Sequence, residues 1–127
     1  MITFCPDCGA PCEQRVPSGD DFPRANCTSC ARVHYENPKL VVGAVATFEG
    51  RVLLCKRGIE PRRGFWTIPA GFMENGETTA EGAQREAREE AGVELVIGSL
   101  LGVYDLTHVR QVMLVYRATL PGPELNP

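Results

Sequence analysis

Three glutamates in the middle of the chain have the type and spacing of residues that bind a divalent cation. Glu86, Glu89 and Glu90 lie three and four positions apart, so in a helix their carboxylates share one face. Carboxylate oxygens are hard ligands that suit Mg²⁺ or Mn²⁺. Like charges at this spacing weaken an isolated helix, and the alternative interpretation is a solvated charged face that binds nothing.

The residues upstream of the glutamates favour the metal site. Gly71 is followed after five residues by Glu77, and after seven more by residues 85–93, which read REAREEAGV. This pattern fills every position of the Nudix box, so the chain resembles the Nudix hydrolases, enzymes that cleave a nucleoside diphosphate linked to another group. The resemblance implies a catalytic Mg²⁺ or Mn²⁺ held by Gly71 (through its carbonyl oxygen), Glu86, Glu89 and Glu90.

The same resemblance gives roles to the neighbouring charged residues. Glu77 is expected to reach toward the glutamate cluster, and Arg85 to orient it as an ion-pair partner. The expected catalytic set is therefore Glu77, Arg85, Glu86, Glu89 and Glu90. The general base stays open between a glutamate of the box and a carboxylate from a later loop.

Four further residues have the spacing of a structural zinc site. Two Cys-x2-Cys pairs, eighteen residues apart, are formed by Cys5, Cys8, Cys27 and Cys30. Such pairs place four thiolates at the corners of a tetrahedron around Zn²⁺. The alternative is a pair of redox dithiols, which requires a different surrounding fold. Cys12 is a spare cysteine, and Cys55 lies in an apolar segment and is expected in the core.

A basic segment precedes the box and is a candidate for binding the substrate's phosphates. It contains Lys56, Arg57, Arg62 and Arg63, of which the three arginines are the expected substrate-binding residues. The alternative is a basic loop that only improves solubility. Phe65 and Trp66 follow it and are expected to pack beneath the site rather than to stack on a base.

The chain divides by composition into two parts. Residues 1–36 are rich in proline and too few to bury a sufficient core, so we expect a zinc ribbon whose folding free energy comes from the metal. Residues 37–127 carry strand patterns at 40–48, 51–56, 65–69, 93–103 and 112–120. The Nudix resemblance implies an α/β/α sandwich with a mixed sheet for this part. About 90 residues are fewer than such domains usually have, so the C-terminal helix is expected to be missing.

One helix must position the glutamates. Thr78 and Glu81 have the spacing of a capping box, and Gly92 is suited to end the helix. Ala80, Ala83, Ala87 and Ala91 form a shallow apolar stripe that lets the helix approach a sheet closely.

Composition excludes several classes of partner. With 13 basic and 16 acidic residues the net charge is −3, which gives no indication of a nucleic-acid surface. No apolar run has the length of a membrane span, and the N-terminus lacks the features of a signal peptide, so we expect a cytoplasmic protein. A homodimer is left open.

The resemblance extends to a subgroup with an N-terminal zinc ribbon. The residues that carry it include 35–39 (YENPK), 52–57 (VLLCKR) and 66–71 (WTIPAG), which are similar to the FAD pyrophosphatases of plant chloroplasts. This implies hydrolysis of FAD or ADP-ribose to AMP plus FMN or ribose 5-phosphate. NADH pyrophosphatases are an alternative, weakened because residues 94–111 lack the proline-rich motif of that group. A zinc-ribbon protein that senses a nucleotide without turnover is the other alternative.

Overall fold

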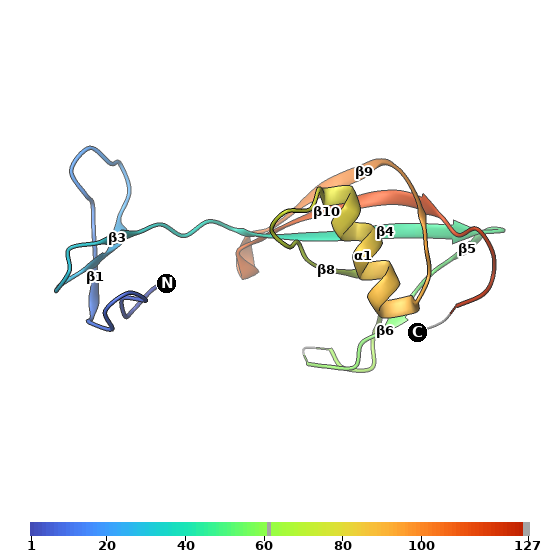
Figure 1. Ribbon diagram of the computed structural model, residues 1–127, viewed down its shortest axis with the longest axis horizontal. Helices are drawn as coiled ribbons and strands as arrows, with labels where there is room; N and C mark the ends of the chain where they lie inside the picture. The colour runs from blue at the N-terminus through green and yellow to red at the C-terminus, as the bar shows by residue number, and fades with distance from the viewer. Residues whose placement is uncertain (61, 126–127) are drawn as a thin grey trace. The chain divides into compact units, whose positions relative to one another are not determined.

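The chain divides after Asn37 into two units, which are described separately (Figure 1). The computed structural model describes residues 1–60 and 62–125. The first unit, Met1–Asn37, contains a three-stranded antiparallel sheet in the order β1-β2-β3. Its strands are β1 (Cys12–Arg15), β2 (Arg24–Cys27) and β3 (Val33–His34).

The first unit buries little apolar surface. Cys5, Ala25 and Cys27 are its buried apolar residues among those the structure describes. The one buried polar side chain in this part, that of Asn26, donates hydrogen bonds to the carbonyl oxygens of Arg15 and Arg24, at 2.9 and 2.8 Å. So small a core cannot stabilise a fold alone, which agrees with the expected need for a metal.

The second unit, Pro38–Pro127, is built on a five-stranded mixed sheet. Its strands are β4 (Lys39–Phe48), β5 (Arg51–Val52), β8 (Ala70–Phe72), β9 (Val96–Leu106) and β10 (Gln111–Thr119). The central strand β4 pairs with β10 in parallel, and the other pairs are antiparallel. A 3₁₀ turn at Thr107–Val109 joins β9 to β10. The α/β fold with a mixed sheet that the sequence predicts is therefore confirmed.

One expected strand is divided. The pattern at 51–56 predicts a continuous strand, but the structure has β5 and a separate β6 (Cys55–Lys56), which pairs with β7 (Trp66–Thr67). The reason is competition for one edge of β4. Because β8 pairs with Val41, Val42 and Gly43 on that edge, β5 can pair only with Thr47 and Phe48. The chain then leaves the sheet and forms the β6–β7 hairpin.

Helix α1 (Thr79–Ala91) lies across one face of the sheet (Figure 1). Its alanines at 83, 87 and 91 are buried against a row of small side chains on β4, formed by Val42, Ala44 and Ala46. The helix begins and ends as predicted, with a capping box between Thr78 and Glu81 and with Gly92 in the left-handed conformation at φ 62°. The alanine stripe thus brings the helix close to the sheet and turns its charged flanks outward.

Among the described residues α1 is the one α-helix, so the sheet carries a helical layer on one face. No helix follows β10 in the described part. With 13 residues and many charges, α1 is neither long nor apolar enough to cross a membrane.

Candidate active site and zinc centre

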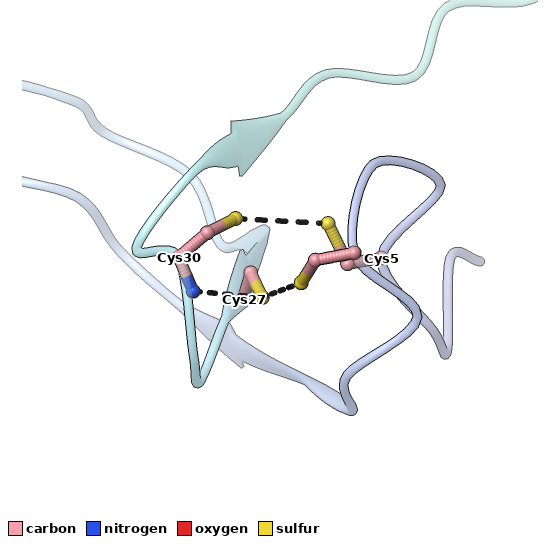
Figure 2. Close-up of side chains that lie close together, drawn as sticks. Cys5, Cys27 and Cys30 are labelled. Carbon is pink, nitrogen blue, oxygen red and sulfur yellow. Dashed lines mark hydrogen bonds between the residues drawn. The ribbon is translucent and has the colours of Figure 1, made fainter.

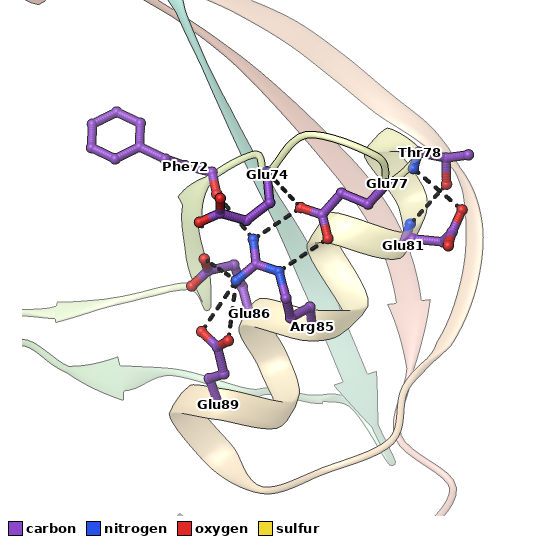
Figure 3. A network of polar contacts seen from close by, with 8 residues as sticks. All are labelled: Phe72, Glu74, Glu77, Thr78, Glu81, Arg85, Glu86 and Glu89. Atoms are coloured by element: carbon purple, nitrogen blue, oxygen red, sulfur yellow. Dashed lines mark hydrogen bonds and ion pairs between the residues drawn. The ribbon is translucent and has the colours of Figure 1, made fainter.

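Arg85 is the centre of a network of charged residues on α1 (Figure 3). Its Nε and Nη2 donate to the two oxygens of Glu77, both at 3.0 Å. Its Nη1 donates to Glu86 Oε1 at 3.0 Å and to both oxygens of Glu89 at 3.2 Å. One guanidinium therefore offsets the repulsion among three carboxylates, and the hydrogen bond to Glu77 is the main cause that raises the pKa of Arg85.

The loop before α1 is fixed by the same arginine. Arg85 Nη2 donates to the carbonyl oxygen of Phe72 at 3.0 Å, and the backbone N–H of Glu74 donates to Glu77 Oε1 at 2.8 Å. The side chain of Glu77 is only 13% exposed, and its hydrogen bonds from Arg85 lower its pKa. Glu77 therefore joins the loop to the helix through hydrogen bonds to its carboxylate from Arg85 and from the backbone of Glu74.

Glu86 lies directly against the backbone of Gly71. Glu86 is buried, with 8% of its surface exposed. A Cβ atom at Gly71 would collide with the carboxylate of Glu86. A larger residue at position 71 would therefore displace the carboxylate of Glu86 from its place beside β8.

Glu90 faces the strand β8 and the β6–β7 hairpin. Its Oε2 accepts a hydrogen bond from the backbone N–H of Ala70 at 3.3 Å. The side chain keeps contact with solvent, but its partial burial raises the pKa of Glu90 to about 7, and the charges of Glu86 and Glu89 add to this shift. Glu89 is the most open of the three, with 58% of its side chain exposed.

The glutamates line one flank of α1 but do not form a closed ligand set. Among the described residues, the groups whose possible ligand atoms all lie within 4.8 Å of one another are both in the first unit. Arg85 Nη1 stands between Glu86 and Glu89, while Glu90 contacts β8. The donors are nevertheless carboxylates beside a backbone loop, the chemistry that suits a hard divalent cation.

The structure changes the expectation for the two aromatic residues. Phe65 and Trp66 do not pack beneath the site, because 61% and 63% of their surfaces are exposed. They belong to the β6–β7 hairpin, which extends away from the sheet (Figure 1). Each strand of this hairpin is only two residues long, and among the described residues the two rings are left largely uncovered. The three arginines expected to bind substrate, Arg57, Arg62 and Arg63, are on this hairpin.

A hollow of about 410 Å³ opens along the other flank of α1. It is lined by Glu77, Ala80, Glu81, Gln84, Arg85, Arg88 and Ile97. At 3.6 residues per turn, Gln84 and Arg88 point to the opposite side of the helix from Glu86 and Glu90. The hollow therefore lies beside β9 and away from the β6–β7 hairpin.

The four cysteines of the first unit come together as the sequence predicts (Figure 2). The sulfur atoms of Cys5 and Cys30 are 3.8 Å apart, and those of Cys8 and Cys27 are 3.4 Å apart. A tetrahedral zinc–thiolate site with bonds of about 2.3 Å has sulfur atoms about 3.8 Å apart, so the set fits Zn²⁺. The backbone N–H groups of Cys30 and Ser29 donate to Cys27 Sγ and lower the pKa of Cys27 to about 6, which favours the thiolate that a metal needs.

Sequence reasoning missed a neighbour of this centre. His34 Nε2 lies 3.3 Å from Cys5 Sγ, and with Asp7 these residues form a second close group. The sequence spacing carried no signal for this contact, because it depends on the pairing of β3 with β2, which places His34 opposite Ala25, two residues before Cys27. Cys12 is not part of either group, and Cys55 packs at the edge of the core of the second unit.

Comparison with known families assigns both units. Residues 3–36 match the family described as Nudix N-terminal, a zinc ribbon, and residues 37–127 match the NUDIX domain. The crystal structure of a NUDIX hydrolase from Nitrosomonas europaea superposes with a TM-score of 0.90 and 48% identity, covering 99% of this chain and 72% of that one.

Two curated relatives illustrate the range of activities among similar proteins. An ADP-ribose pyrophosphatase from Methanocaldococcus jannaschii is 40% identical over 70 residues, which are 55% of this chain and 41% of the relative. An NAD-capped RNA hydrolase, NudC, from Vibrio parahaemolyticus is 28% identical over 126 residues, which are 99% of this chain and 46% of the relative. The chain thus spans somewhat less than half the length of these two relatives.

Zinc content tests the centre in the first unit. Purified protein is expected to contain about one zinc ion per chain, and Cys27→Ser to lower this value sharply because it removes one of four thiolates. Elemental analysis measures both, with Cys12→Ser as the control that keeps its zinc. Disulfide bonds without metal, in protein purified without a chelator, would contradict the zinc centre.

The affinity for a divalent ion is expected to depend on pH through Glu90. Since the pKa of this carboxyl is raised to about 7, its neutral form dominates at pH 6 and its charged form at pH 8. A divalent ion must displace the proton, so the affinity for Mn²⁺ should increase about tenfold from pH 6 to pH 8. Isothermal titration at both pH values measures the increase, and Glu90→Gln should flatten it. A constant wild-type affinity over this range would refute the expectation.

Proposed function

Because this chain belongs to the Nudix hydrolase family, we propose that it is a divalent-metal-dependent pyrophosphatase that hydrolyses the phosphoanhydride of a nucleoside diphosphate derivative. The products from ADP-ribose are AMP and ribose 5-phosphate, and those from FAD are AMP and FMN. ADP-ribose is supported by the name of the archaeal relative, whereas FAD rests on the sequence resemblance alone.

The observation that carries the proposal is the arrangement of carboxylates around Arg85. Glu86 is buried against Gly71, Glu89 is open to solvent, and Glu90 lies beside β8, so the three present carboxylates at different depths along one flank of α1. These glutamates and the carbonyl oxygen of Gly71 would hold Mg²⁺ or Mn²⁺. When bound, such an ion neutralises phosphate charge and lowers the pKa of a water molecule.

The residues of the chain itself act by positioning. Arg85 uses its donors on Glu77, Glu86, Glu89 and Phe72, which leaves it poorly placed to clamp a phosphate and well placed to hold the glutamates. The phosphates not covered by metal would then be neutralised from the β6–β7 hairpin, by Arg57, Arg62 or Arg63. Glu60 is the one acidic residue between Arg51 and Glu74, so this segment is basic overall.

A second candidate is the NADH pyrophosphatase type of activity. It is favoured by the similarity to NudC, which extends over 99% of the chain and so includes the first unit. Both candidate activities include a structural Zn²⁺ bound by the cysteines of the first unit. The homodimer and the cytoplasmic location expected from the sequence stay predictions.

A panel of substrates tests the proposal. Purified protein with Mg²⁺ or Mn²⁺ is assayed on ADP-ribose, FAD and NADH, with release of phosphate from the products by a coupled phosphatase. Glu89→Gln should lower the rate at least about 10²-fold, since it removes about 3 kcal/mol or more of transition-state stabilisation. The fold should persist because Glu89 is largely exposed.

Glu49→Gln is the matched control, because Glu49 lies in the turn after β4 and should leave the rate unchanged. A Glu89→Gln variant with near-normal turnover would remove the metal assignment. Binding of these nucleotides by the wild type without any hydrolysis would instead indicate a nucleotide sensor.

A further inference from the structure

The β6–β7 hairpin exposes two adjacent aromatic rings to a similar extent. Phe65 is 61% and Trp66 63% exposed, and Ile59 in the same hairpin is 71% exposed. Burying a large aromatic side chain is worth a few kcal/mol, so rings left in solvent gain nothing for the fold itself. Exposed aromatic rings beside cationic residues are a common way to bind planar rings that carry phosphate.

The register of the hairpin separates these two rings. Cys55 pairs with Thr67 and Lys56 with Trp66, and the backbone N–H of Arg57 donates to the carbonyl oxygen of Phe65 at 2.8 Å. Side chains alternate along a strand and pairs across a hairpin share a face. Phe65 and Arg57 therefore fall on the face of Cys55, and Trp66 falls on the opposite face with Lys56.

The face that carries Phe65 is also the face of Cys55, which turns toward the core where α1 packs on the sheet. Cys55 packs against the core of the second unit. Glu90 lies near the base of the hairpin, because its Oε2 accepts a hydrogen bond at 3.3 Å from the backbone N–H of Ala70, three residues after Thr67, the partner of Cys55. Phe65 is opposite Arg57, two residues beyond Cys55, about 6–7 Å farther along the strand. Arg57 and Phe65 thus lie side by side on this face, farther from α1 than Cys55.

We propose that Phe65 is the surface on which a planar ring of the nucleotide substrate stacks, with Arg57 on the same face of the hairpin to contact its phosphate. This inference rests on the proposed function, since it extends that site from the diphosphate to the group attached to it. The ligand is an aromatic ring joined through a sugar or sugar alcohol to a phosphate. The hollow along α1 shares Glu77 and Arg85 with the glutamate network, but no described residue of the β6–β7 hairpin lines it, so it is a separate surface.

The products of the proposed reaction test the inference without any turnover. AMP carries the adenine ring and FMN the flavin ring, each with one phosphate. Their dissociation constants are measured by isothermal titration in Mg²⁺ for the wild type, Phe65→Ala and Trp66→Ala. Trp66→Ala is the matched control, because it removes a similarly exposed ring from the other face of the same hairpin. Circular dichroism verifies that each variant is folded.

Phe65→Ala is expected to weaken the binding of at least one product by about 5- to 150-fold, the usual loss when a stacked aromatic residue is removed. Trp66→Ala should stay within about twofold of the wild type for both. If Phe65→Ala loses affinity for AMP alone, adenine is the stacked ring, and if it loses affinity for FMN alone, the flavin is. A loss of affinity for both products indicates that either ring is accepted.

The inference is overturned if Phe65→Ala binds both products as tightly as the wild type does. It is also overturned if Trp66→Ala weakens binding as much as Phe65→Ala, or if the wild type binds neither product. Its failure is distinguishable from failure of the proposed function. If the wild type hydrolyses a dinucleotide but Phe65→Ala does not weaken product binding, the inference is wrong and the proposed function stands. If Phe65→Ala weakens product binding but the wild type hydrolyses no dinucleotide, the proposed activity is wrong and the stacking site at Phe65 stands.

Discussion

The arrangement of the candidate active site depends on the hydrogen bonds of one guanidinium. Glutamates spaced three and four apart repel one another in a helix, and Glu86 is also buried, where an unpaired charge is costly. Arg85 contacts Glu77, Glu86 and Glu89 at 3.0 to 3.2 Å and also holds the carbonyl oxygen of Phe72. The planar fork of arginine suits several carboxylates at once, whereas a lysine presents a single compact charge. Without it, Glu77, Glu86 and Glu89 would lose the cation that they share, and the carbonyl oxygen of Phe72 would lose its hydrogen bond to the helix.

Local signals predicted the elements that depend on neighbouring residues. The capping box at Thr78, the stop at Gly92 and the alanine stripe of α1 are decided within a few residues, and all three are present. The division of the segment at 51–56 depends instead on which strand takes the edge of β4. That is decided by β8, which is distant in sequence and too short to be recognised from its pattern. Competition between strands for one edge cannot be predicted from the hydrophobic pattern of the segment itself.

The chemistry of the two sites was more visible in the sequence than the surfaces around them. Spacing indicated the four cysteines, which the structure brings together, and it made the glutamates of the box candidates for a metal site, because ligand geometry limits how far apart such residues can be. The closeness of His34 to Cys5 and the exposure of Phe65 and Trp66 were not predicted. Large aromatic residues are usually at least partly buried, and these two are exposed because they belong to a short hairpin outside the main sheet.

The central claim is that Arg85 arranges the glutamates to bind a divalent ion, and its most direct test is Mn²⁺ binding to the Arg85→Lys variant. Electron paramagnetic resonance of free Mn²⁺ gives the affinity of the wild type and the variant at one pH. Lysine keeps the positive charge but not the fork, so the affinity is expected to fall about 10- to 100-fold, as for other residues that orient metal ligands, while the helix content stays unchanged. An Arg85→Lys protein that binds Mn²⁺ as tightly as the wild type would contradict the account.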